Sequence, residues 1–107
     1  MPWRLALSRY RPLIVAGPNA HLLLLYVYID DMLERRGPFR EDHLAWVGAE
    51  REAGRVIMAG ALGDPPTGAA IVFRGVDPEH VEEFVVGDPY MESGLILSYR
   101  VETWNVV

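Results

Sequence analysis

The sequence contains no cysteine, which excludes disulfide bonds, thiolate catalysis and metal sites built on cysteine. It also lacks an apolar run near the roughly 20 residues of a transmembrane helix. The first segment is basic, but its apolar part, PLIVAG, is too short for a signal peptide and is followed by Pro18. We therefore expect a cytoplasmic protein that has no membrane partner.

A basic patch is missing as well. The formal net charge is -5, which argues against nucleic acid and anionic membranes as partners. Residues 1–21 differ from the rest, because they carry Arg4, Arg9 and Arg11, several prolines and no acidic residue. We interpret residues 1–21 as an N-terminal extension and residues 22–107 as one domain. The chain is 50% hydrophobic, which is enough to form a core.

Four apolar segments are typical of strands. The run LLLLYVYI, residues 22–29, has no polar interruption and suits a strand buried on both faces. Residues 55–62 and 69–75 flank the turn-forming stretch GDPPTG, so we expect them to form a hairpin. The alternation in LILSYRVETWNVV predicts a long final strand over residues 95–107.

Two longer segments and one short one are predicted to be helical. Apolar residues recur at helical spacing over residues 38–53, before Gly54, which is a common C-terminal stop. Asp77 and the proline after it are typical of a cap and a first helical position, and they begin a predicted helix over residues 77–86. A single helical turn is predicted over residues 89–93.

The order of these elements, β-α-β-β-α-β, predicts a ferredoxin-like α+β fold. Such a fold has a four-stranded antiparallel sheet with two helices on one face. The second face needs cover too, since strand 22–29 offers no polar side to water. We therefore expect a homodimer in which a partner subunit packs sheet against sheet.

Two residues allow a chemical interpretation as well as a structural one. His43 lies in the stripe of the first helix that is expected to be buried. It is either a hydrogen-bonded histidine at the edge of the core or a general acid or base facing a pocket. Asp88 has the pattern of an N-cap, as does Asp77. A carboxylate has two oxygens, however, so one can cap while the other orients a histidine.

Other residues would complete a site. Arg40, one turn before His43, is either a solvated charge or an anchor for a substrate carboxylate. Phe39, Trp46 and Tyr90 would line an aromatic pocket, although core packing is an alternative role for such residues. The three histidines show no HxH, HxxH or HExxH spacing, so no metal site is predicted.

Five segments occur in the order and spacing of a known family: FREDHLAWV, RVIMAGAL, PTGAAIVF, GDPYMESGL and TWNVV. Through them the chain resembles the YciI-like (YCII-related) proteins over residues 22–107, and residues 1–21 are left outside. The resemblance implies a dimeric ferredoxin-like α/β barrel, related in fold to muconolactone isomerases. It also implies an active site that pairs His43 with Asp88. Some relatives remove chloride from chlorinated ring compounds.

Two functional hypotheses follow. The first is a cofactor-independent lyase or isomerase that performs acid–base chemistry, by isomerisation or elimination, on a small cyclic or carbonyl compound. In this hypothesis His43 is the acid/base, and Asp88 orients it and favours its protonated form. The side chains that would hold the substrate are Arg40, Tyr90, Trp46 and Phe39. The alternative is a non-catalytic dimeric domain that binds a metabolite or a partner protein in the same cleft.

Overall fold

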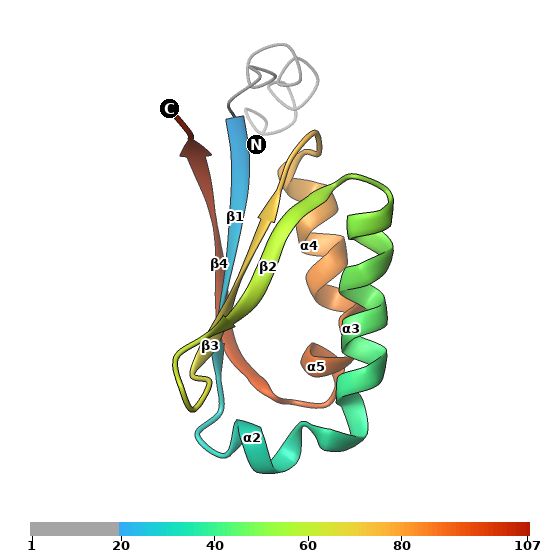
Figure 1. Cartoon of the computed structure of the whole chain (residues 1–107), viewed down its shortest axis with the longest axis vertical. Helices are drawn as coiled ribbons and strands as arrows, with labels where there is room; N and C mark the ends of the chain where they lie inside the picture. Colours follow the sequence, from blue (N-terminus) through green and yellow to red (C-terminus); the bar gives the residue numbers. More distant parts are fainter. Residues whose placement is uncertain (1–19) are drawn as a thin grey trace, which may run out of the picture.

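The structure, a computed structural model, describes residues 20–107 and has the predicted α+β fold (Figure 1). Its helices and strands are, in chain order, β1 (Ala20–Tyr28), α2 (Met32–Arg35), α3 (Gly37–Glu52), β2 (Val56–Leu62), β3 (Gly68–Phe73), α4 (Pro78–Gly87), α5 (Pro89–Glu92) and β4 (Ile96–Asn105). The ferredoxin-like order is confirmed, with α2 added before the first long helix. Of the predicted extension, residues 1–19 lie outside the described part of the chain.

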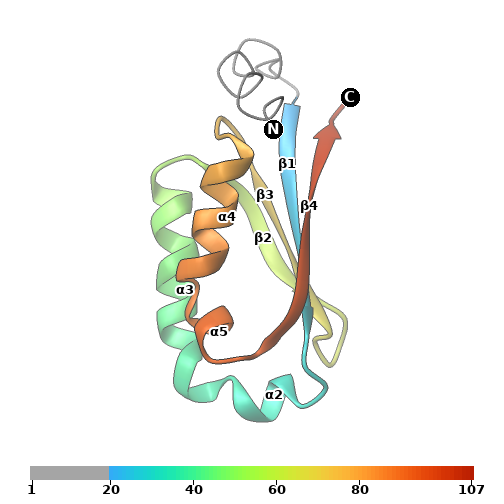
Figure 2. The ribbon, with the colours of Figure 1, turned by 180° about the vertical axis from the view of Figure 1, so that it is seen from behind.

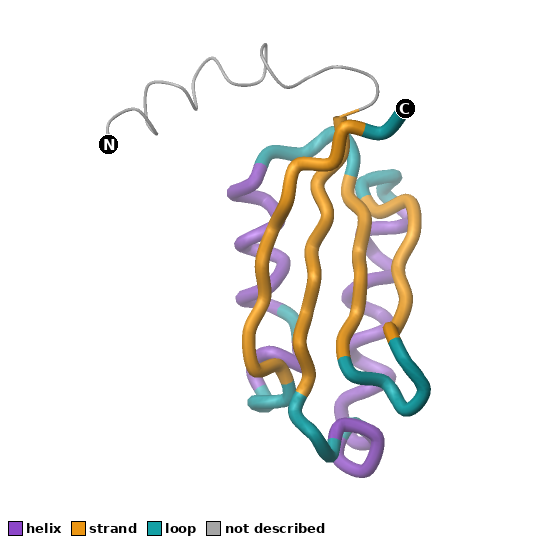
Figure 3. The backbone as a smooth tube through the Cα atoms, turned by 90° about the vertical axis from the view of Figure 1, so that its left-hand side faces the viewer, coloured by secondary structure: helices purple, strands orange, loops and turns teal. Residues whose placement is uncertain are grey.

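The four strands form one antiparallel sheet in the order β2-β3-β1-β4. β2 and β3 pair as the predicted hairpin. On β1, Leu24 pairs with Ile71 of β3 and with Val101 of β4, so β1 lies in the middle of the sheet. Figure 2 shows α3 and α4 side by side over one face. Figure 3 looks onto the opposite face, which is not covered by any of the described helices.

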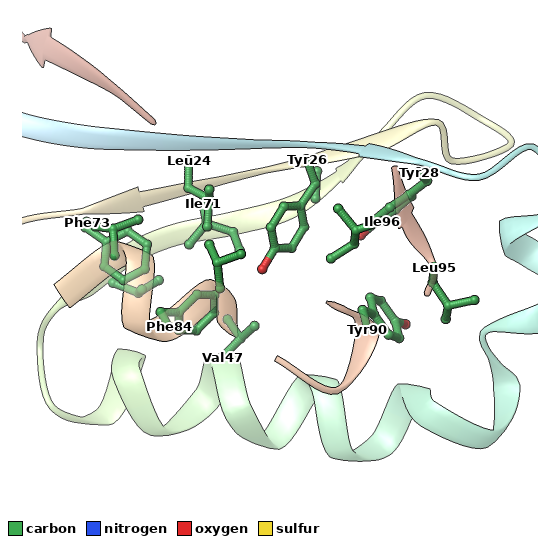
Figure 4. Packing of buried hydrophobic residues seen from close by; sticks show 14 of the residues in the cluster. Leu24, Tyr26, Tyr28, Val47, Ile71, Phe73, Phe84, Tyr90, Leu95 and Ile96 are labelled. Carbon is green, nitrogen blue, oxygen red and sulfur yellow. The ribbon is translucent and has the colours of Figure 1, made fainter. Parts of the chain in front are cut away.

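Alternation along β1 separates the two faces of the sheet. Leu24, Tyr26 and Tyr28 are buried toward the helices, where they join a core that includes Ile71 and Phe73 (Figure 4). Because successive strand residues point to opposite faces, Leu23, Leu25 and Val27 face away from the helices. Val27 is 45% exposed, so within one chain these residues are less buried than those that face the helices.

The first long helix, α3, is less buried than its apolar spacing predicts. Of its residues only His43 and Val47 are buried, whereas Leu44 is 48% exposed and Phe39 is 36% exposed. The strand opposite supplies part of the reason, because β2 carries the small residues of the sequence AGA. These side chains leave space between helix and sheet where a larger residue would have filled the core.

A polar cluster joins the end of α3 to the start of α4. Glu50 accepts hydrogen bonds of 3.0 and 2.8 Å from Arg55, and its Oε1 lies 2.6 Å from Nε2 of His80. The Arg55 hydrogen bonds lower the pKa of Glu50 to about 2, and His80 adds to this effect against the opposing influence of burial. At the start of α4, Asp77 caps the helix by accepting from the N–H of His80 at 3.0 Å, as predicted.

In the part of the chain from residue 20 onward, none of the helices has the length and apolar character needed to cross a membrane.

Glu50→Gln is expected to lower the free energy of unfolding by about 1–3 kcal/mol at neutral pH, because Arg55 and His80 lose a charged acceptor. The pKa of Glu50 is lower in the folded chain than in the unfolded one. Its contribution is therefore complete above about pH 4.5 and is lost as the pH falls toward about 2. Urea unfolding at several pH values should show the difference between the two proteins shrinking below about pH 4.5.

Glu52→Gln is the matched control, since Glu52 is an exposed carboxylate at the end of the same helix. It should change the stability by less than about 0.5 kcal/mol. A difference between wild type and Glu50→Gln that stays constant down to about pH 3 would contradict the assignment.

Candidate active site

Asp88 stands between α4 and α5 and is fully buried, with 0% of its surface exposed. Its Oδ1 accepts from the N–H of Tyr90 at 2.9 Å, so the predicted cap is confirmed. The same oxygen lies 2.8 Å from Nδ1 of His43, and Oδ2 accepts from the hydroxyl of Tyr26 at 2.7 Å. One oxygen therefore both caps the helix and holds the histidine, in contrast to the predicted division between two oxygens.

His43 projects from the middle of α3 and is 7% exposed. An ionised carboxylate only accepts hydrogen bonds, so the contact with Asp88 assigns the proton to Nδ1 of the imidazole. In the neutral ring, Nε2 is then the nitrogen with a free lone pair. Nε2 has no hydrogen-bond partner within residues 20–107. The buried carboxylate of Asp88 thus sets the orientation of the His43 imidazole.

Tyr90 contacts both His43 and Asp88. Its backbone N–H binds Asp88, and its ring stacks on the imidazole of His43 with 3.7 Å between ring centroids and 5° between ring planes. The ring of Tyr28 meets Tyr90 edge-on at 6.1 Å. Figure 4 shows Tyr26, Tyr28 and Tyr90 in the layer between β1 and α3. Burial raises the pKa of each of these three hydroxyls, so all remain protonated near neutral pH.

Tyr26 is the site residue that the sequence reasoning missed. Burial, followed by the charge of Asp88, raises the pKa of the Tyr26 hydroxyl, which keeps this group a donor to the carboxylate. A signal was present in the sequence, because strand alternation places Tyr26 on the same face as Leu24 and Tyr28. A buried tyrosine hydroxyl usually requires a hydrogen-bond partner. The pattern in LLLLYVYI therefore predicts a buried acceptor near residue 26.

A cavity of about 220 Å³ lies beside His43, between α3 and the sheet. Arg36, the residue before α3, lines it together with a stripe of α3 at helical spacing, formed by Arg40, His43, Val47 and Arg51. The facing strand β2 contributes Ala59, Gly60 and Ala61, and Tyr28 and Tyr90 also border the cavity. The histidine is thus buried in the fold and still borders a space that a small molecule can occupy.

The predicted site residues fall into two groups. Arg40 and Tyr90 line the cavity with His43, and Asp88 lies directly behind the histidine. Trp46 instead packs against α4, where its Nε1 donates to the carbonyl of Phe84 at 2.9 Å. A side chain added at Gly87 would collide with the Trp46 indole, so these two helices pack closely.

Phe39 also lies outside the lining of the cavity. Helical geometry accounts for the placement of both aromatic residues. Phe39 and Trp46 are seven residues apart, so they share one face of α3, while Arg40 and Arg51 occupy a neighbouring face. The sequence reasoning grouped them with the pocket by residue type, whereas helical position separates them from it.

No group of three or more histidine, aspartate and glutamate side chains within residues 20–107 is arranged to hold a metal ion.

Comparisons with known proteins give a family and a fold. A family model of the YCII-related domain matches residues 20–105. Among solved structures, the chain is similar to 5-chloro-2-hydroxyhydroquinone dehydrochlorinase from Burkholderia phenoliruptrix in complex with 2,5-dihydroxybenzoquinone. The TM-score is 0.68 and the sequence identity 22%, over 78% of this chain and 92% of that one. At this identity the likeness shows a shared fold. A search of curated proteins found no match.

Tyr26→Phe is expected to lower the free energy of unfolding by about 1–3 kcal/mol, because it leaves Oδ2 of the buried Asp88 without a partner. Chemical denaturation at neutral pH measures the change. Tyr99→Phe is the matched control, since the Tyr99 hydroxyl donates to Glu82 at 2.6 Å on the surface. The control should change the stability by less than about 0.5 kcal/mol. Equal losses of unfolding free energy in the two variants would contradict the prediction, because the buried Tyr26 hydroxyl would then contribute no more than an exposed one.

Proposed function

The chain belongs to the YCII-related domain family, and on that premise we propose that it is a cofactor-independent enzyme that moves protons on a small cyclic or carbonyl compound. The observation that carries the proposal is the state of His43. Its Nδ1 is held by a fully buried carboxylate at 2.8 Å, and its ring borders the cavity. With Nδ1 held by Asp88, Nε2 of the same ring is the nitrogen that would perform general acid–base catalysis on a molecule in the cavity.

The reaction begins with Nε2 of His43 taking a proton from a carbon beside a carbonyl or enol group of the substrate. The electron pair of the broken C–H bond moves into the substrate, and the imidazole becomes an imidazolium. Asp88, 2.8 Å from Nδ1, stabilises this cation. In an isomerisation, Nε2 returns the proton to another carbon. In an elimination, the electron pair expels a leaving group such as chloride from the neighbouring carbon.

The substrate would be small and would lie against Tyr90, with Arg40 binding an anionic or oxygen-bearing group. The cavity of about 220 Å³ is below the usual size of pockets for drug-sized ligands, which favours a compact compound. The dehydrochlorinase that shares this fold is described in complex with 2,5-dihydroxybenzoquinone, a small oxygenated ring. That likeness supports a cyclic substrate and a reaction of the elimination type.

The uncovered face of the sheet is, in the same proposal, the interface of a homodimer. Strand pairing places exposed apolar residues on this face, among them Val27 (45% exposed), Met58 (67%) and Trp104 (46%). A second copy that packs its own sheet there would remove this surface from water.

His43→Ala is expected to slow proton transfer by about 10²–10⁴-fold, because it removes the only proposed acid/base. A panel of hydroxylated and chlorinated ring compounds and lactones is incubated in D2O with the protein. NMR then measures deuterium incorporation at carbon, and ion chromatography measures chloride release. His80→Ala is the matched control, since His80 contacts Glu50 and lies outside the lining of the cavity. The control should retain the wild-type rate.

A wild-type protein that binds members of the panel without exchanging protons or releasing chloride would support the alternative function. In that case the chain would be a dimeric binding domain, and His43 would serve to position a ligand.

Val27→Asp is expected to convert the dimer to a monomer, because it places a charge in the proposed interface. Light scattering coupled to gel filtration measures the mass. Val86→Asp is the control, since Val86 is 69% exposed on α4, away from the uncovered face of the sheet. A wild-type protein with the mass of one chain, or an equal loss of mass in both variants, would contradict the proposed interface.

A further inference from the structure

The cavity beside His43 has a charge opposite to that of the whole chain. The formal net charge is -5, and the ten basic residues are all arginines. Three of them, Arg36, Arg40 and Arg51, line this one cavity. No aspartate or glutamate is among the described residues that line it. Guanidinium groups gathered without acidic neighbours attract anions.

Three of the four other described arginines are paired with a carboxylate, Arg74 being the exception. Arg35, Arg55 and Arg100 each form an ion pair with a carboxylate of the chain. Within residues 20–107, no such pair involves the three cavity arginines. Their charges are left to be neutralised by solvent ions or by a ligand, and a ligand that supplies carboxylate oxygens matches the planar fork of guanidinium.

The positions along α3 place these charges on both sides of the histidine. Arg36 and Arg40 precede His43, whereas Arg51 follows it by eight residues, or about 12 Å along the helix axis at 1.5 Å per residue. An arginine side chain is long and flexible, so the guanidinium groups can approach a common ligand from these positions. Arg36 and Arg40 also act on the opposite wall of the cavity, where they partly offset the effect of burial on the pKa of Tyr28 and Tyr90.

We propose that the cavity binds a small organic acid with two anionic groups, one held by Arg36 and Arg40 and the other by Arg51. The uncharged middle of this ligand lies against Ala59, Gly60 and Ala61, a wall that offers no charge. The inference rests on the proposed function in one respect, since the bound acid is also the substrate whose central carbon faces His43. It adds the substrate class and assigns binding roles to Arg36 and Arg51.

Three probes that share a benzene ring but differ in charge test whether the charge of the ligand determines its affinity. They are terephthalate with two carboxylates, benzoate with one, and the uncharged benzamide. Calorimetry at low ionic strength measures the Kd of each. Terephthalate is expected to bind about tenfold more tightly than benzoate, and benzoate about tenfold more tightly than benzamide. Arg40→Gln should weaken both acids by about tenfold. Arg51→Gln should abolish only the advantage of terephthalate over benzoate.

Arg74→Gln is the matched control, because Arg74 is an exposed arginine outside the cavity lining. It should leave all three Kd values unchanged. The proposal is overturned if benzamide binds as tightly as benzoate, or if Arg74→Gln weakens binding as much as Arg40→Gln does. It is also overturned if neither acid binds more tightly than about 10 mM.

These binding measurements do not depend on turnover. The experiments can therefore refute the anion site without refuting the enzymatic function, and the reverse. Acids that bind through the arginines while no proton exchange occurs would refute the enzymatic function and leave the anion site standing. Turnover that depends on His43 but acts on uncharged compounds as well as on acids would refute the anion site and leave the enzymatic function standing.

Discussion

The buried carboxylate of Asp88 is the constraint on which the arrangement of the site depends. Moving a charged group out of water is costly unless other groups replace its hydration. Here the replacements come from β1, α3 and α5, through the Tyr26 hydroxyl, the His43 imidazole and the Tyr90 N–H. Each of these elements must therefore keep its position relative to the others. The geometry of the histidine follows from this packing and needs no ligand to set it.

The helix α3 has one face that packs against α4 and another that lines the cavity, and His43 lies between these two faces. On one side, Trp46 and Glu50 contact residues of α4 and hold the two helices together. On the other side, Arg40 and Arg51 line the cavity. A residue between these faces can reach a buried group behind it and a ligand in front of it. The small residues of β2 complete the arrangement, because they leave the cavity that larger side chains would have filled.

The sequence predicted the fold well because hydrophobic period and capping are local signals. The Asp77 and Asp88 caps, the β2–β3 hairpin and the helix around His43 all follow from neighbouring residues. The pairing of His43 with Asp88 came from the family resemblance, since no local pattern links residues 45 positions apart. Which carboxylate oxygen binds which donor depends on the placement of three elements to within an ångström, and no spacing rule supplies that.

In the proposed reaction, only one side chain of the site can exchange a proton with the substrate. Asp88 is occupied by three donors, and burial raises the pKa of Tyr28 and Tyr90 so that neither hydroxyl ionises near neutral pH. Arginine stays charged throughout. Among the described residues that line the cavity, Nε2 of His43 is then the atom that accepts and returns the proton in the proposed reaction. An isomerisation at this site must therefore remove and replace the proton on the same face of the substrate. An elimination must instead pass the proton from Nε2 to solvent before the next turnover.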